Sequence, residues 1–154
     1  MSAVTLAEEV RSGELSPMEV VEAYLERIDE RDGSVRAYIS VLEEQARSAA
    51  VKQTEQLAEG TDPGPLAGVP VGVKDTVDVE GVPTTQGTSL LAENTAQSDD
   101  PAVARLREKG SLFLGKTNTP AFARSAVTES AIAGYCSTPF GKGDNAGGAS
   151  GGSA

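Results

Sequence analysis

The chain changes character near residue 60, and no other feature constrains its fold as much. At three places in the first 60 residues a Ser or Thr is followed three positions later by Glu, a pattern typical of helix starts. These pairs are Thr5 and Glu8, Ser16 and Glu19, and Ser40 and Glu43. They predict three helices, which end at Gly13, near Glu30 and near Glu59. An Asp32-Gly33 turn and a short extended piece at residues 37–39 are expected between the second and third helices.

Beyond the Gly- and Pro-rich segment 60–65, short apolar runs replace the helical pattern. Residues 69–73 and 112–114 predict buried strands, residues 77–82 a further extended piece, and residues 100–109 a helix that Gly110 ends. Strand, helix and strand after a helical start indicate an α/β fold, with the N-terminal helices wrapping the sheet. We therefore expect a helical arm over residues 1–60 and the first part of an α/β core over residues 61–154.

Composition limits the class of protein and its partners. The 154 residues are 38% hydrophobic and 23% charged, which fits one soluble globular domain. The net charge of −10 argues against nucleic acid and anionic membranes as partners, and it reflects either plain solubility or an acid-rich, halophilic proteome. No apolar run is long enough to span a membrane, and no signal peptide is recognised. A reducing cytoplasm is the expected location.

The absence of histidine removes several chemistries. Without it, no Ser-His-Asp triad, Cys-His pair or His-ligated zinc can form within this chain. Any general base must be a carboxylate, a lysine or another unusual group. Cys136 is alone, so an internal disulfide and a Cys-cluster metal site are excluded, and no histidine activates it as a nucleophile. We expect neither a metal nor a cofactor.

One nucleotide-binding pattern is rejected because the predicted order of helix and strand does not fit it. Residues 110–117 satisfy G-x4-G-K-[ST], but that motif needs a strand before its first glycine and a helix at its lysine. Here a predicted helix precedes Gly110, the apolar run between the glycines is itself the predicted strand, and Pro120 follows closely. A buried strand that Lys116 leaves is the better interpretation.

Two other elements can build a hydrolase site without histidine. Lys74 ends the apolar segment 65–74, and the glycine-rich run 147–153 lies near the chain end. Alone, such a lysine is usually solvated, and such a run is usually a linker or a tight turn. Nests of backbone N–H groups that hold oxyanions also use such runs. A lysine accepts a proton only when it is neutral, and burial away from carboxylates favours that form. The apolar residues before Lys74 suit such burial, and Asp75 should point to the other side of the strand.

Together with their flanks, these elements resemble the amidase signature family. Residues 65–75 resemble its lysine block, and residues 147–153 its glycine- and serine-rich loop. Residues 81–85, 104–110 and 114–120 resemble the segments between them in the same order, and residues 16–28 are similar to the family's N-terminal arm. The resemblance covers nearly the whole chain. It implies an α/β/α core with a mixed sheet, and a catalytic unit of lysine, a bridging serine in a cis peptide and a nucleophilic serine that forms an acyl-enzyme from an amide.

The chain departs from this pattern at two places. The bridging serine corresponds to Ala149, which has no hydroxyl, whereas Ser150 matches the second serine, which supports the loop. The resemblance puts the nucleophile and the oxyanion hole beyond Ala154. Gly147, Gly148, Gly151 and Gly152 match the glycines of the loop. We therefore expect the 154 residues alone to be inactive, and also poorly stable, because strand edges and apolar faces would stay uncovered.

Three functions stay open. The first is an amidase that hydrolyses a small carboxamide, and this chain would be its N-terminal fragment. The second is a degenerate interaction protein, and the third is a glutaminase-type subunit of a tRNA-dependent amidotransferase, which would need partner chains. The codons after Ala154 separate them. A homodimer or a missing C-terminal portion is the expected protein partner. Ala126, Val127 and Thr128 are expected either to line the acyl pocket, with Tyr135 and Cys136 as further candidates, or only to pack the loop.

Overall fold

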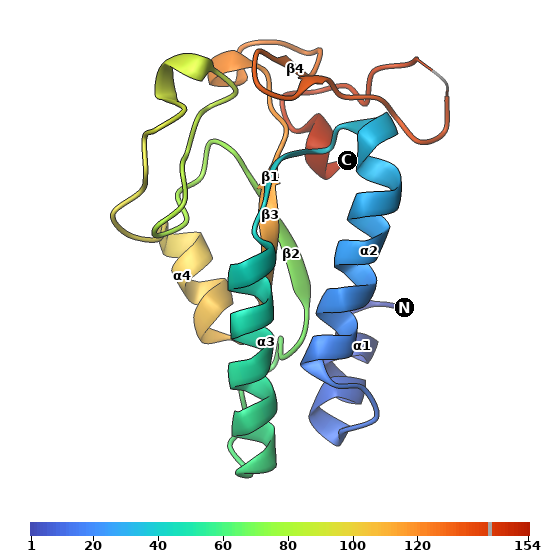
Figure 1. Cartoon of the computed structure of the whole chain (residues 1–154), viewed down its shortest axis with the longest axis vertical. Coiled ribbons are helices and arrows are strands. Elements are labelled where there is room, and N and C mark those ends of the chain that lie inside the picture. The colour runs from blue at the N-terminus through green and yellow to red at the C-terminus, as the bar shows by residue number, and fades with distance from the viewer. Residues whose placement is uncertain (142) are drawn as a thin grey trace.

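A mixed three-stranded sheet lies at the centre of the computed structural model, which describes residues 1–141 and 143–154 (Figure 1). Its strands are β1 (Tyr38–Val41), β2 (Pro70–Lys74) and β3 (Leu112–Thr117), in the order β1-β3-β2. β1 runs antiparallel to β3, and β2 runs parallel to it. The predicted α/β class with a mixed sheet is confirmed.

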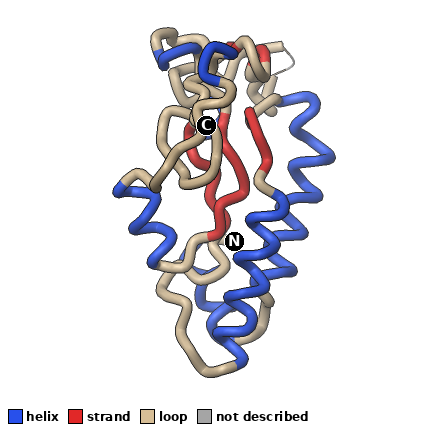
Figure 2. The backbone as a smooth tube through the Cα atoms, turned by 60° about the vertical axis from the view of Figure 1, so that its left-hand side comes forward, coloured by secondary structure: helices blue, strands red, loops and turns tan. Residues whose placement is uncertain are grey.

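Helices cover both faces of this sheet (Figure 2). On one face, α2 (Pro17–Val35) and α3 (Glu43–Ala58) pack on β3, and α1 (Ala3–Ser12) packs near the start of α2. On the other face, α4 (Pro101–Glu108) and the segment after β2 enclose Phe113. The two main clusters of buried side chains are Val21, Leu25, Ala46, Ala50, Leu112 and Leu114, and Leu42, Val73, Val79, Val82, Val103 and Phe113. Apart from Phe113 both clusters are aliphatic, in keeping with the aromatic content of only 4%.

The capping signal at Ser16 is confirmed, but α2 continues further than predicted. The Ser16 hydroxyl accepts the N–H of Glu19, and the Glu19 carboxylate accepts the N–H of Ser16. The predicted turn at Asp32-Gly33 is wrong, because the helix runs to Val35 and ends at Arg36 with a left-handed φ of 55°. The Asp32 carboxylate instead accepts the N–H of Ala37, at 2.7 Å, beyond the helix end.

Two other predicted helix starts are wrong. The N-cap of α1 is Ser2, whose hydroxyl accepts the N–H of Thr5, so the helix begins before Thr5. The N-cap of α3 is Leu42, which provides no side-chain cap. Ser40 cannot serve there because it belongs to β1, where it pairs with Lys116 of β3. Strand pairing therefore overrides a local capping signal.

The second half of the chain is mostly turns that run over the strand ends. Residues 77–82 form no strand, although Pro83 bridges to Thr95. Two short strands, β4 (Glu129–Ser130) and β5 (Gly134–Tyr135), pair with each other. The single-turn 3-10 helices are η1 (Ser89–Leu91), η2 (Ala121–Ala123) and η3 (Gly151–Ser153). Within the described residues, no helix has the length and apolar character needed to cross a membrane.

Candidate functional site

The site is built where two parallel strands end at the same edge of the sheet. Lys74 is the last residue of β2 and is in register with Thr117, the last residue of β3. Registered neighbours in a sheet project from the same face. A Cβ atom at Gly72, two residues before Lys74, would lie 2.8 Å from the Cγ2 atom of Thr117, which identifies this face. The Thr117 hydroxyl forms a 2.7 Å hydrogen bond with the hydroxyl of Ser153. Lys74 therefore faces the side of the sheet on which the glycine-rich loop lies.

The glycine-rich loop is fixed onto these strand ends by hydrogen bonds. The N–H of Gly152 donates to the carbonyl of Asn118 over 3.2 Å, and the Thr119 hydroxyl donates to the carbonyl of Ala149 over 2.9 Å. The buried Thr128 hydroxyl donates to the carbonyl of Gly148 and accepts the N–H of Gly151, over 2.6 and 3.0 Å. Figure 1 shows this C-terminal segment beside the ends of the strands. The loop is thus an ordered part of the site.

The predicted loop residues differ in their surroundings. Ala149 is half-buried and presents only a methyl group, whereas Ser150 is exposed at the start of η3 and its side chain forms no cap. Gly147 and Gly148 adopt left-handed φ values of 78° and 64°, which turn the chain at this point. The cis peptide implied by the resemblance is wrong for this chain, because every described peptide bond is trans and the two left-handed glycines make the turn.

The residues expected to line an acyl pocket do not share one environment. Ala126 and Val127 are exposed, but Thr128 is fully buried and its hydroxyl is used by the loop. Cys136 is also fully buried, and burial raises the pKa of its thiol. A protonated, buried thiol is a poor nucleophile. Thr128 thus anchors the loop. The sequence analysis gave packing of the loop only as the alternative to lining the acyl pocket.

Lys116, a second lysine, was expected to leave its strand, but the structure keeps it inside β3, where it pairs with Val73. Sequence reasoning therefore missed its role. It is fully buried in β3, whereas Lys74 is half-buried. Its Nζ atom lies 3.4 Å from the Oδ1 atom of Asp75 and donates to the hydroxyl of Thr84 over 2.9 Å. Burial lowers the pKa of Lys116, and the Asp75 carboxylate opposes this shift. The sequence did offer one signal for the position of Lys116. Side chains alternate between the two faces along β3, which puts Lys116 on the face opposite Thr117 and the loop. Lys116 is therefore not in a position to serve the loop as a base.

One polar atom of the site has no partner in the described part of the chain. The Asn118 side-chain oxygen is buried and accepts no hydrogen bond, although its amide nitrogen donates to the carbonyls of Arg36 and Gly134. Buried acceptors are normally satisfied. Within the described residues, the Asn118 side chain therefore holds the end of β3 through its amide nitrogen alone.

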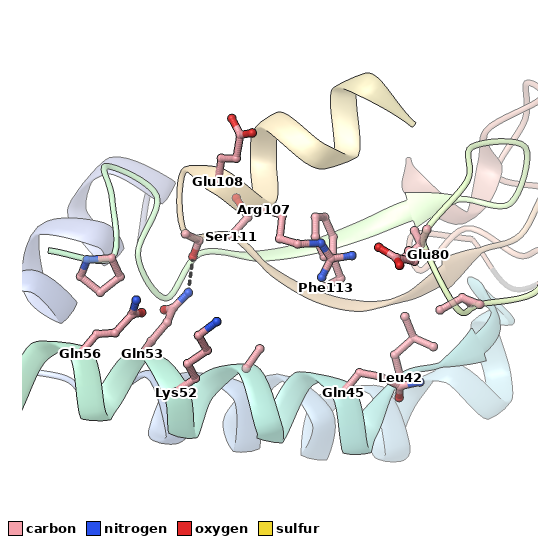
Figure 3. A pocket seen from close by; sticks show the side chains of 15 residues that line it. Leu42, Gln45, Lys52, Gln53, Gln56, Glu80, Arg107, Glu108, Ser111 and Phe113 are labelled. Carbon is pink, nitrogen blue, oxygen red and sulfur yellow. Dashed lines mark hydrogen bonds between the residues drawn. The ribbon is translucent and has the colours of Figure 1, made fainter. Parts of the chain in front are cut away.

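A cavity of about 330 Å³ between α3 and α4 lies apart from the candidate site (Figure 3). Its wall includes Lys52 and Gln56 of α3, Glu108 of α4 and Phe113 of β3. Neither Lys74 nor the glycine-rich loop contributes to it. Nothing in its lining therefore connects this cavity with the candidate site.

Comparison with known proteins gives a consistent result. A family model described as Amidase matches residues 19–154. The chain is 40% identical to an acylamidase from Rhodococcus erythropolis, over 97% of this chain and 31% of that protein. It is 43% identical to the A subunit of the glutamyl-tRNA(Gln) amidotransferase from Salinispora tropica, over 99% of this chain and 31% of that protein.

A solved structure agrees in fold. A bacterial aryl acylamidase, described as a member of the amidase signature enzymes, superposes with a TM-score of 0.93 at 33% identity, over 99% of this chain and 32% of that chain. The chain thus spans about a third of the length of the relatives that it matches.

Proposed function

Because the chain belongs to the amidase signature family, we propose that it is the N-terminal part of an amidase that hydrolyses the C–N bond of a small linear carboxamide by a Ser-Ser-Lys mechanism. One observation carries this proposal. The glycine-rich loop is fixed on the strand ends beside Lys74, through the bond between Thr117 and Ser153. A lysine and such a loop on one face of a sheet can supply the base and the bridging position of a histidine-free acyl transfer, in which a serine nucleophile needs an adjacent base.

In this proposal, Lys74 is the base and residue 149 is the bridge to the nucleophile. A serine there would pass the nucleophile's proton to the lysine and later to the leaving amine. Ala149 cannot do so, and the nucleophile belongs to a segment beyond residue 154. The exposed Ala126 and Val127 contact the acyl part of the substrate. Residues 1–154 alone are therefore inactive.

The test is ammonia release from a panel of small carboxamides. It compares residues 1–154 with a gene product that continues through the family's nucleophile segment, and it includes the variants Lys74→Met and Lys52→Met. Lys52 is exposed on α3 and serves as the matched control. We expect hydrolysis only by the longer product, and faster hydrolysis when it carries Ala149→Ser. In that A149S background K74M should lower the rate about a hundredfold or more, and K52M should not change it. An A149S rate that K74M leaves unchanged would overturn the proposed role of Lys74. A longer product that hydrolyses no amide would favour a non-catalytic interaction protein.

A second candidate is a glutaminase-type subunit of a tRNA-dependent amidotransferase. The similarity to the amidotransferase chain from Salinispora tropica, 43%, is at least as high as that to the acylamidase, 40%. This function uses the same lysine and loop but needs partner chains. Ammonia release from glutamine that appears only when partner subunits are added would favour it, whereas release from simple carboxamides without partners would exclude it.

A further inference from the structure

Asp75 connects the candidate site to a turn on the opposite face of the sheet. Its carboxylate accepts the N–H groups of Thr85 and Gly87, each over 3.2 Å, and also the hydroxyl of Thr85. Its own N–H donates to the carbonyl of Thr117 over 3.1 Å. One fully buried residue therefore joins β2, β3 and the turn at residues 83–88.

Lys116 completes this connection from β3. Its ammonium lies 3.4 Å from Asp75, donates to the Thr84 hydroxyl over 2.9 Å and reaches the carbonyl of Pro83 at 3.5 Å. Both charged side chains are completely shielded from solvent. Removing one partner of such a pair leaves an uncompensated buried charge, whereas removing both is often tolerated.

Each residue of the pair is the chain neighbour of a residue of the candidate site. Asp75 directly follows Lys74, the last residue of β2, and Lys116 precedes Thr117 on β3. Because successive residues of a strand point to opposite faces, the ion pair lies behind the two residues that face the loop. A backbone shift at Asp75 or Lys116 would therefore also displace Lys74 or Thr117, their neighbours in the chain.

The turn that the pair holds also supports the loop. A Cβ atom at Gly87 would overlap the carbonyl oxygen of Thr119, and the N–H of Phe122 donates to the carbonyl of Gln86 over 2.9 Å. The Thr119 hydroxyl in turn donates to the carbonyl of Ala149. A continuous series of contacts thus leads from Asp75 through Gly87 and Thr119 to the bridging position.

We propose that the buried Asp75–Lys116 pair is a positioning device that fixes Lys74 and the glycine-rich loop relative to each other. The functional part of this inference rests on the proposed amidase activity. Neither residue touches substrate, so both act through the backbone at Lys74 and Thr117 and through the turn at residues 83–88.

The first test measures amide hydrogen exchange, segment by segment, in residues 1–154. It compares the unchanged chain with Asp75→Asn, Lys116→Met and the double variant, which keeps the fold if a single variant does not. The control is Glu22→Gln with Arg47→Met, which removes an exposed ion pair on α2 and α3. We expect exchange to increase about a hundredfold at residues 84–87 and 147–154 in the single variants, while the α2 and α3 amides stay protected. The control should change nothing.

Two results would overturn the proposal. An increase spread evenly over α2 and α3 would mean that the pair contributes only to global stability. An increase limited to residues 84–87, with the loop unchanged, would mean that the pair does not hold the loop.

The second test uses whichever gene product releases ammonia in the assay above. D75N/K116M should lower kcat about a hundredfold at an unchanged KM. Lys116→Arg keeps the positive charge beside Asp75, so its rate should lie between that of D75N/K116M and that of the unchanged protein. A raised KM at an unchanged kcat would contradict positioning of the base. If no product hydrolyses amides, the proposed amidase function fails, while hydrogen exchange still decides whether the pair holds the loop.

Discussion

Lys74 and Lys116 lie on neighbouring parallel strands, face opposite sides of the sheet and have different surroundings. Lys74 is half-buried beside Thr117 and the loop, whereas Lys116 is fully buried against Asp75 and Thr84. A buried lysine needs a partner to stay charged, and Asp75 is that partner. By burial alone, Lys116 would be the better candidate for a base with a lowered pKa. Its pairing with Asp75 makes it a structural cation instead.

The surroundings of Lys116 predict a pH dependence of stability. Because burial lowers the pKa of Lys116, the native chain binds fewer protons than the unfolded chain between that pKa and the free value of about 10.4. The free energy of unfolding contributed by this group must therefore rise with pH across that window. We expect the difference in unfolding free energy between the unchanged chain and D75N/K116M to grow from neutral pH towards about pH 10.

Urea unfolding of both proteins at a series of pH values checks this. Burial also raises the pKa values of Tyr38 and Cys136, which makes their contributions fall as pH rises. Both groups are present in both proteins, so their effects cancel in the difference. A difference that is constant or that falls with pH would show that Lys116 does not titrate as its burial requires.

At the scale of elements, the important feature is how closely the glycine-rich loop approaches the strand ends. A Cβ atom at Gly152 would overlap the carbonyl oxygen of Ala37 and the amide nitrogen of Asn118. Only glycine fits there without displacing η3 or the residues after β3. The loop therefore depends on this glycine for its place beside Lys74.

This close approach predicts the effect of Gly152→Ala. We expect faster hydrogen exchange in residues 147–154, with unchanged exchange in β2 and β3, because the added methyl group lifts the loop but leaves the sheet intact. The matched control is Gly33→Ala in α2, where a Cβ atom meets nothing within 4 Å. That change should stabilise the helix by about 0.5–1 kcal/mol. If G152A left the exchange of the loop unchanged, the loop would not be held as described.

The elements also show which parts of the fold the sequence predicts. Two local signals held, at Ser16 with Glu19 and at Asp100, whose side chain caps α4. The local signal at Thr5 did not, because Ser2 caps α1 instead. The predicted cap at Ser40 failed because a partner 76 positions away in sequence, Lys116, claims that residue for the sheet. Local pattern cannot reveal such long-range pairing.

The same distinction applies to the site. Lys74 and the glycine-rich loop were recognised because their motifs are continuous in sequence. The Asp75–Lys116 pair and the anchoring role of Thr128 join residues that are far apart in the chain, such as Thr128 and Gly148. They became visible only when the strands and the loop were placed together.

At the scale of the whole molecule, the sheet ends at β1 on one side and at β2 on the other within the described residues. Strand edges that lack a partner favour pairing with another chain. Phe140, which is 97% exposed, adds apolar surface far from these edges in sequence. The isolated 154 residues therefore carry two kinds of surface that favour association.

We predict that residues 1–154 associate as concentration rises. Light scattering coupled to size-exclusion chromatography should give an average mass above the 15.8 kDa of one chain, and this mass should increase with loading. Phe140→Ser should leave the association in place if the strand edges cause it. A constant mass of one chain, together with a single steep urea transition, would contradict the prediction, and loss of association in F140S would assign it to the exposed ring instead.

The central claim is that Lys74 takes a proton through position 149 of the loop. The most direct measurement is the rate of ammonia release from a small carboxamide by a gene product that continues through the nucleophile segment, by its Ala149→Ser variant, and by A149S combined with Lys74→Met. The claim predicts that A149S raises the rate about a hundredfold or more, and that K74M removes the whole gain. A gain that persists without Lys74, or an A149S variant no faster than the parent, would contradict it.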